Sequence, residues 1–277
     1  MMAPSGSGDV PASDVDESSV WADLVPRLRL KAGEVHVWRA SLARLGELPA
    51  LWSTLTADER SRADRFGLPR DRARFVTARG LLRVILGWHL DRDPAVLRFR
   101  YGPQGKPALA DGGELRFNVA HAGDLALYAF SLGCELGVDV ERVRTDLPLA
   151  AMADVVLSPR DRIALAAAFP TRRPDAFFPR WVLKEAYVKA VGAGMSMALE
   201  RISIDLGPDS WATVMVDGAP AETDRWRLRS LDLGAGHVAA LAVEGSDWRL
   251  ICRRWRDAVP AATLPPPLSA SPRPSAA

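Results

Sequence analysis

The chain has 277 residues, of which 48% are hydrophobic and 25% charged, a balance typical of a globular protein with one or two domains. Its formal net charge of +2 argues against a nucleic-acid binder, and no apolar run reaches the roughly 18 residues of a membrane span. The acidic first residues do not resemble a signal peptide, and two cysteines make neither a disulfide framework nor a metal-binding pattern. These features predict a cytoplasmic protein without a nucleic-acid or membrane partner.

The composition divides the chain into two tails and two halves. Residues 1 to about 19 are small, polar and acidic, and residues 257–277 are rich in Pro and Ala, so we expect a mostly disordered tail over 1–32 and a disordered tail over 257–277. Between them we predict an N-terminal half over 33–133 and a C-terminal half over 134–256. Each half has helices followed by short strands, which predicts an α+β fold with antiparallel pairing. The similar element order suggests two halves related by a pseudo-two-fold, with a ligand cleft between them.

The first half begins with an alternating strand and continues with two helices. Thr56 and Glu59 form a capping box that predicts a helix to about residue 66. A longer helix follows over 69–89 with an apolar stripe at spacings of three and four. The stripe consists of Phe75, Ala78, Leu82, Ile85 and His89. The predicted strands cover 34–42, 97–101, 115–119 and 125–131, with a turn at 102–105.

The second half begins with a strand over 137–141. Ser158 followed by Pro159 predicts a helix start, and an amphipathic helix is expected over 175–191. The remaining predicted strands cover 201–206, 211–216, 225–231 and 237–243, with a last strand over 248–252 that is expected to pair at an edge.

Two acidic residues lie two apart in the sequence GVDVE. Asp139 and Glu141 would point to the same face of a strand, where they repel each other unless a cation separates them. Such an oxygen pair suits Mg²⁺, which shares its remaining positions with phosphate and water. The alternative is a solvent-facing strand edge in which nearby arginines balance the charge.

The helical sequence WVLKEAYVK carries two of the chain's four lysines. Glu185 and Lys189 are four residues apart and share a helix face, which Lys184 flanks. This group could place one carboxylate near a metal ion and two ammonium groups near phosphates. The alternative is an ordinary surface salt bridge, worth a few tenths of a kcal/mol.

Other basic residues lie in the first half. Residues 60–83 contain eight arginines against two aspartates, which indicates either an anion-attracting patch or a solvated helix face. His121 follows a strand and precedes a glycine turn, so it could bind a phosphate or merely cap a hairpin. Lys106 lies in a second glycine turn that indicates nothing by itself.

The motifs in their order resemble the 4′-phosphopantetheinyl transferases, in the larger, pseudo-dimeric class typified by the surfactin synthetase activator. The resemblance rests on YGPQGKP, FNVAH, GVDVE and WVLKEAYVK, and it covers about residues 56–206. It implies transfer of the phosphopantetheine arm of coenzyme A to a serine of an apo carrier protein, with release of adenosine 3′,5′-bisphosphate.

The resemblance also implies roles for particular residues. Asp139, Glu141 and Glu185 are expected to hold Mg²⁺, and Glu185, Lys189 and Asp139 to be catalytic. Lys184 and Lys189 are expected to contact the phosphates of coenzyme A.

Four further residues match contacts to the nucleotide end of coenzyme A. Lys106 is expected at the adenine–phosphate end, and His121 and Arg62 near the ribose 3′-phosphate. Arg74 corresponds to a basic contact on the first long helix.

The chemistry needs positioning and charge neutralisation, because the serine hydroxyl attacks a phosphorus atom whose oxygens carry negative charge. Glu185 is our hypothesis for the general base, directly or through water. The family usually has serines on both sides of the histidine, whereas this chain has Ala120 and Ala122. We expect weaker nucleotide binding for that reason.

Two other functions remain open: a catalytically weak coenzyme A- or nucleotide-binding module, and a Mg²⁺-dependent phosphohydrolase. The expected partners of a transferase are acyl, polyketide or peptidyl carrier proteins, serving polyketide or nonribosomal peptide synthesis among other pathways. Because both halves of the cleft belong to one chain, we expect a monomer.

Overall fold

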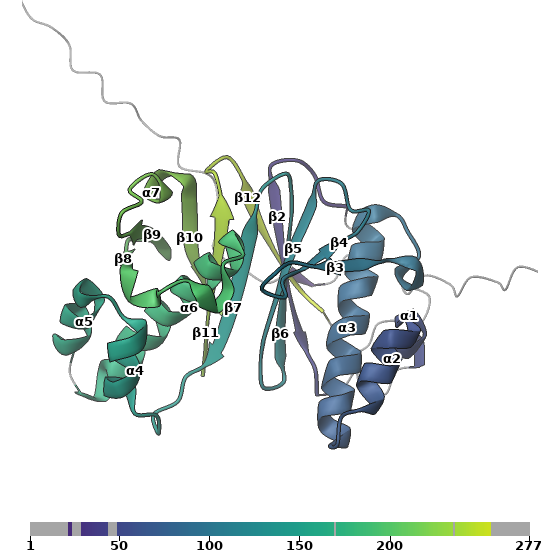
Figure 1. Ribbon diagram of the computed structural model, residues 1–277, viewed down its shortest axis with the longest axis horizontal. Coiled ribbons are helices and arrows are strands. Elements are labelled where there is room, and N and C mark those ends of the chain that lie inside the picture. The colour runs from purple at the N-terminus through teal and green to yellow at the C-terminus, as the bar shows by residue number, and fades with distance from the viewer. Residues whose placement is uncertain (1–21, 24–28, 44–48, 169, 235, 256–277) are drawn as a thin grey trace, which may run out of the picture.

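The computed structural model describes residues 22–23, 29–43, 49–168, 170–234 and 236–255. Figure 1 shows two α+β halves side by side, with strands meeting in the middle and helices towards the outer sides. The predicted α+β class is confirmed. The tails predicted over 1–32 and 257–277 lie largely or wholly outside the described residues. No helix within the described ranges is long and apolar enough to span a membrane.

The first half contains strands and helices in the predicted order. They are β2 (Glu34–Ser41), α1 (Pro49–Thr54), α2 (Ala57–Asp64), α3 (Pro69–Leu90), β3 (Phe99–Tyr101), β4 (Pro107–Leu109), β5 (Leu115–Ala122) and β6 (Leu125–Leu132). A short 3₁₀ turn, η1 (Pro94–Val96), follows α3. The predicted capping box is present, since the Thr56 hydroxyl accepts from the Glu59 amide and the Glu59 carboxylate accepts from the Thr56 amide.

The second half repeats this order from β7 onwards. Its elements are β7 (Leu136–Arg142), α4 (Leu149–Val156), α5 (Pro159–Ala166), η2 (Pro170–Arg172), α6 (Arg173–Val191), η3 (Gly194–Ser196), η4 (Leu199–Arg201), β8 (Ile202–Leu206), β9 (Trp211–Val216), α7 (Glu222–Arg225), β10 (Trp226–Leu231) and β11 (His237–Glu244). Ser158 caps α5 as predicted, by accepting from the Asp161 amide. Helices α1 and α4 were not predicted.

The two sheets have corresponding strand orders. In the first, β2 pairs with β6 and β6 with β5, all antiparallel. In the second, β7 pairs with β11 and β11 with β10 in the same way. In chain order, the β3–β4 hairpin follows the long helix of the first half, just as the β8–β9 hairpin follows the long helix of the second. The two differ in that β3 and β4 form a separate sheet, whereas β8 and β9 extend the second sheet. The shared topology is what a duplicated α+β unit would produce.

The prediction for the last strand is wrong. β12 (Arg249–Arg254) is not at an edge of the second half: it runs parallel to β2 in the first sheet, between β2 and the two-residue strand β1 (Ala22–Asp23). The end of the chain therefore returns to the N-terminal half, and in sheet terms residues 249–254 belong with 33–133.

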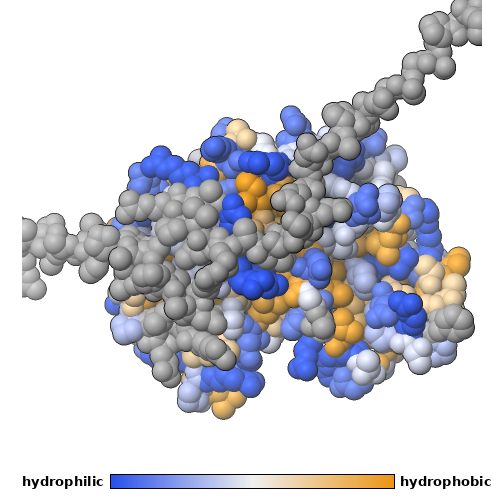
Figure 2. Space-filling model, turned by 180° about the vertical axis from the view of Figure 1, so that it is seen from behind, coloured by the Kyte–Doolittle hydropathy of each residue, from blue (hydrophilic) through white to orange (hydrophobic). Residues whose placement is uncertain are grey.

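The two sheets face each other across an apolar cluster. Val35 and Val37 of β2 pack there with Val138 and Val140 of β7. The opposite face of the first sheet packs on α3, and the opposite face of the second packs on α6. Because neighbouring residues of a strand point to opposite faces, burying Val138 and Val140 between the sheets turns Asp139 towards α6. Figure 2, seen from behind, shows apolar surface along the middle of the molecule, flanked by hydrophilic surface.

Helix α3 is buried over more of its circumference than the predicted stripe. Leu82 and Ile85 of that stripe are in the core, but so are Leu81 and Val84. The reason is that α1 and η1 cover further sides of the helix: a Cβ added at Gly80 would lie 2.8 Å from the Cβ of Leu51.

Candidate active site

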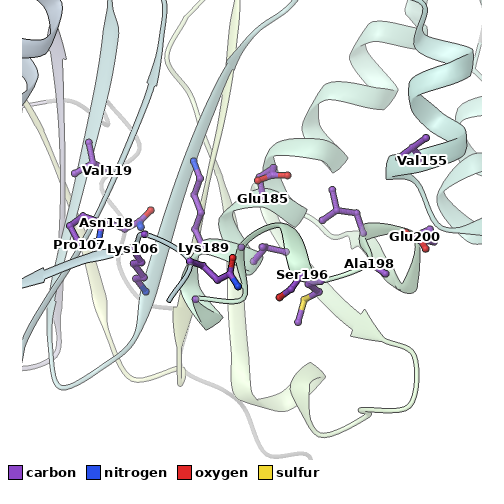
Figure 3. Close-up of a pocket in the computed structure, with 17 residues that line it drawn as sticks. Lys106, Pro107, Asn118, Val119, Val155, Glu185, Lys189, Ser196, Ala198 and Glu200 are labelled. Carbon is purple, nitrogen blue, oxygen red and sulfur yellow. The ribbon is translucent and has the colours of Figure 1, made fainter. Parts of the chain in front are cut away.

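A cavity of about 720 Å³ lies between the two halves, as the sequence predicted, and its size falls in the usual range for small-molecule sites. Figure 3 shows side chains reaching it from both halves. The first half contributes Gln104, Gly105, Lys106, Pro107, Asn118 and Val119. The second half contributes Val155, Glu185, Val188, Lys189, Gly192, Gly194, Ser196, Met197, Ala198, Leu199 and Glu200.

Close packing of α6 on β7 brings the predicted acidic and basic residues together. Gly137 makes this approach possible, because a Cβ there would overlap the backbone of Ala186 and Ala190. At this separation the Lys189 ammonium group donates to Asp139 Oδ1 at 2.6 Å. Gly137 is therefore needed because it lets helix α6 pack closely against strand β7, and not because its backbone adopts an unusual φ angle.

The three predicted carboxylates influence one another electrostatically. Asp139 is 5% exposed, and burial raises its pKa although Lys189 opposes the shift. Burial and the neighbouring Asp139 charge raise the pKa of Glu141. Burial and Asp139 likewise raise the pKa of Glu185, although Lys189 and the nearby Trp181 side chain oppose the shift. The cluster carries three carboxylates around the Lys189 ammonium, an excess of negative charge that a cation would relieve.

The donor set fits a divalent metal ion, although it is not preassembled. Asp139 Oδ2 is buried without a hydrogen-bond partner, which leaves an oxygen available to a ligand. Carboxylate oxygens shared with phosphate and water are the ligands that Mg²⁺ favours. Among the described residues, however, no group of three or more His, Cys, Asp or Glu side chains is close enough to hold a metal. Asp139 is instead paired with Lys189.

The structure does not bring Lys184 to the cavity, which contradicts the expected phosphate contact. Its side chain is fully buried and forms an ion pair with Asp161 at 2.7 Å. It also donates to the carbonyl oxygens of Val156 and Leu199. Burial lowers the pKa of Lys184, although Asp161 opposes this shift. The physical reason for the error is that the residue next to Glu185 lies about 100° further round the helix and points to another face.

Lys106 lines the cavity but uses its ammonium group to join the halves. It extends from the turn between β3 and β4 and contacts Glu135 at 3.1 Å, and it donates to the carbonyl oxygens of Leu136 and Ala190. Ala190 is in the last turn of α6, where a cation also meets the negative end of the helix dipole.

The remaining predicted contacts lie outside the cavity lining. His121 is exposed at the end of β5, and it is close enough to Asp139 to oppose slightly the rise in the pKa of that carboxyl group. Arg74 bridges Asp71 and Asp124, at 3.5 and 2.6 Å. Arg62 is exposed, with its guanidinium 5.2 Å from the centre of the Phe75 ring. Their predicted roles in binding coenzyme A stay predictions.

Four of the eight arginines of the cluster form ion pairs within the first half. Arg79 and Arg83 both pair with the buried carboxylate of Glu59, and Arg72 pairs with Asp64 at 3.0 Å. Part of the arginine cluster is therefore a structural network of the helices, whereas Arg62, Arg65 and Arg70 are exposed and have no salt bridge among the described residues.

Sequence reasoning missed two parts of the cavity. Asn118 belongs to the FNVAH motif, but no role was predicted for it. Its Oδ1 accepts a hydrogen bond from the Val138 amide and so connects β5 to β7. The segment 192–200 after α6 forms much of one wall. Its only sequence signal is the glycine at 192, which ends α6 in the left-handed conformation at φ 72°.

Comparisons with known proteins identify the family. A family model described as the 4′-phosphopantetheinyl transferase superfamily matches residues 135–242. A second, described as 4′-phosphopantetheinyl transferase, N-terminal, matches residues 37–132. The two matches meet at the boundary between the halves.

Several proteins are similar along most of the chain. The 4′-phosphopantetheinyl transferase HetI of Nostoc sp. is 38% identical over 233 residues, which cover 83% of this chain and 95% of HetI. The putative 4′-phosphopantetheinyl transferase slr0495 of Synechocystis sp. is 34% identical, with 67% and 75% covered. The 4′-phosphopantetheinyl transferase Sfp of Bacillus subtilis is 26% identical, with 71% and 85% covered.

The chain belongs to the 4′-phosphopantetheinyl transferase superfamily, in the larger class in which one polypeptide supplies both halves. The family and the enzyme class predicted from the four sequence motifs are confirmed.

Proposed function

We propose that the protein transfers the 4′-phosphopantetheine arm of coenzyme A to a serine of an apo carrier protein. The observation that carries this proposal is the position of Glu185 and Lys189 on the wall of the cavity between the halves, with Lys189 bonded to Asp139. Membership of the transferase superfamily supports the same conclusion.

The reaction makes and breaks one P–O bond. The serine oxygen bonds to the β-phosphorus of coenzyme A, and the bond from that phosphorus to the bridging oxygen breaks, which releases adenosine 3′,5′-bisphosphate. The serine proton passes to Glu185, directly or through a water molecule. In the metal-free protein, burial and the Asp139 charge raise the pKa of Glu185, which favours proton uptake. Lys189 supplies positive charge to the phosphate oxygens as the charge on them changes.

We further propose that Asp139, Glu141 and Glu185 hold Mg²⁺. When bound, the ion neutralises charge on the diphosphate of coenzyme A. The unpartnered buried oxygen of Asp139 and the raised carboxyl pKa values support this assignment.

The first half would contact the nucleotide end of coenzyme A through His121, Arg74 and Arg62. Lys106 would contribute a fixed positive charge on the cavity wall, since its ammonium group is already bonded to the second half. We propose that the protein acts as a monomer in the cytoplasm, where its two unpaired cysteines are compatible with a reducing compartment. Its partners would be acyl, polyketide or peptidyl carrier proteins.

The second candidate is a coenzyme A-binding module without turnover. The residues that favour it are Ala120 and Ala122, where the family pattern has hydroxyl groups. Asp139, Glu185 and Lys189 favour catalysis instead, because binding alone does not need a general base beside a metal site.

One experiment separates these functions. The protein is incubated with coenzyme A, Mg²⁺ and each of a panel of apo carriers, and the carriers are examined by intact mass spectrometry. Attachment of the arm supports the transferase. Coenzyme A binding without attachment supports the binding module, and cleavage of coenzyme A without attachment supports a phosphohydrolase.

A further inference from the structure

Lys184 is a fully buried cation with three oxygen atoms close to its ammonium group. Its ammonium group contacts Asp161 at 2.7 Å, the Val156 carbonyl oxygen at 2.9 Å and the Leu199 carbonyl oxygen at 3.2 Å. Two of these contacts are hydrogen bonds, to Val156 and Leu199, and the third is the ion pair with Asp161. Because the Lys184 side chain is 0% exposed, a phosphate cannot reach its ammonium group.

Asp161 connects this cation to two more elements. It lies in the first turn of α5 and is 1% exposed. Its Oδ1 accepts from the Ile204 amide of β8 at 3.2 Å, while Oδ2 faces Lys184. Arg180 of α6 also faces Asp161, with its Nε 3.6 Å from Oδ1, so the buried carboxylate is held to α6 by two cations. The pair thus fixes α5 and β8 against α6.

The elements that Lys184 joins form the second-half wall of the cavity. Val155, which precedes Val156 at the end of α4, lines the cavity, and Leu199 of η4 lines it directly. Figure 3 shows Val155 and Glu185 reaching the cavity from separate elements. Lys184 precedes Glu185 in α6, so one buried charge holds two parts of the wall against the helix that carries the proposed base.

We propose that Lys184 is a positioning residue which, together with Asp161, fixes the α4–η4 wall relative to Glu185, and that it does not bind coenzyme A. The kinetic part of this inference rests on the proposed transfer reaction. Lys189 differs in both respects: its side chain is 31% exposed and it lines the cavity. The two lysines of one helix therefore have separate tasks, one inside the fold and one in the site.

Lysine labelling tests the inference on the unaltered protein, without any activity measurement. The chain has only four lysines, at 31, 106, 184 and 189, so peptide mass spectrometry can follow each one during reaction with an amine reagent. We expect Lys184 to stay unmodified while exposed Lys31 reacts fast and Lys189 reacts measurably. Coenzyme A should slow modification of Lys189 and leave Lys184 unchanged. Modification of Lys184 as fast as that of Lys189, with protection by coenzyme A, would overturn the proposal.

Substitutions test the positioning role. We expect Lys184→Met and Asp161→Asn each to lower kcat 10- to 100-fold, while the coenzyme A dissociation constant changes less than 3-fold, because misplacement affects the reaction more than ground-state binding. The double variant should lose no more than the worse single variant, since both changes break one pair.

A phosphate-binding lysine would behave differently: Lys184→Met would weaken coenzyme A binding at least 10-fold, and Asp161→Asn would not. That result overturns the proposal. If a single variant does not fold, the labelling result decides. Absence of transfer to every apo carrier would refute the proposed function, yet the labelling would still decide the place of Lys184.

Discussion

In the first half, the buried carboxylate of Glu59 is shared by the guanidinium groups of Arg79 and Arg83. In the second half, Lys189 bonds Asp139, and Glu141 and Glu185 interact with these two residues electrostatically. The first arrangement has more cations than anions and the second has more anions than cations. Burial opposes ionisation of Glu59, yet the two arginines hold its pKa below the ordinary value. In the second half burial and mutual repulsion raise the carboxyl pKa values.

The same topology therefore uses buried charge for stability in the first half and for a candidate binding site in the second. The face of β2 that meets α3 carries the core residue Trp38, and the corresponding face of β7 carries Asp139. In the first half the strand face is a packed core and the charges lie among the helices. In the second half the strand face carries Asp139, whose Oδ1 bonds Lys189 on the cavity wall and whose Oδ2 has no hydrogen-bond partner.

The largest effect is expected at the proposed base. Glu185→Gln should lower transfer to an apo carrier by 10²- to 10⁴-fold, because the amide cannot accept the serine proton. The carrier-loading rate measures this, and coenzyme A binding should remain. Glu200→Gln is the matched control, since Glu200 lines the same cavity on η4; its rate should stay within 3-fold. Equal rates for the two variants would show that Glu185 has no special part in proton transfer.

In the first half, the expected effect is on stability. Arg83→Met should lower the free energy of unfolding by about 3 kcal/mol, because it removes a cation that is 1% exposed from a buried carboxylate. Arg72→Met, which breaks a pair with side chains 42% and 60% exposed, should cost less than about 1 kcal/mol. Urea unfolding measures both. Similar losses in the two variants would contradict a special role for the buried network.

The two regions should respond to pH in opposite directions. The pKa of Glu59 is lower in the folded state, so its stabilising effect is present above the ordinary carboxyl pKa and is lost as pH falls. The pKa of Glu185 is higher in the folded state, so the folded protein holds its proton more tightly and stability falls as pH rises through the ordinary carboxyl range.

In metal-free buffer at pH 7, Glu59→Gln should therefore be less stable than the unaltered protein, and Glu185→Gln more stable. Both differences should shrink towards pH 3. Unfolding curves across this range check the signs, and a pH-independent gain in Glu185→Gln would point to packing instead of charge.

The smallest effect is expected where this chain departs from the family pattern. Ala120 and Ala122 are 4% and 9% exposed and pack in the cluster between the sheets. Changing both to serine should tighten coenzyme A binding only a few-fold, because their side chains face away from the side of the strand that His121 occupies. Titration calorimetry measures the affinity. No gain would mean that the missing hydroxyl groups do not limit binding in this chain.

Local signals in the sequence predicted the parts of the structure that depend on near neighbours. The capping box at Thr56 and the start of α5 at Ser158 follow from spacing and turn chemistry, whereas the bond between Asp139 and Lys189, which are 50 positions apart, was not predicted. The parallel pairing of β12 with β2 could not be predicted this way, since the bonded residues Glu34 and Arg249 are 215 positions apart.

The same limit explains the error at Lys184. Its partner Asp161 is in another helix, and no local pattern links the two residues. Lys31 is exposed, Lys106 and Lys189 are partly buried, and Lys184 is fully buried. The residue type alone does not distinguish these surroundings.

The proposal that Asp139, Glu141 and Glu185 hold a catalytic Mg²⁺ ion is tested most directly by the Mg²⁺ dependence of transfer. Chelator-treated protein is titrated with Mg²⁺ at saturating coenzyme A and apo carrier, for the unaltered chain and for Glu141→Gln. We predict no transfer without the metal and a Mg²⁺ requirement at least 10-fold higher in the variant, because one proposed ligand is lost. Full transfer without any divalent ion, or an unchanged Mg²⁺ requirement in Glu141→Gln, would contradict it.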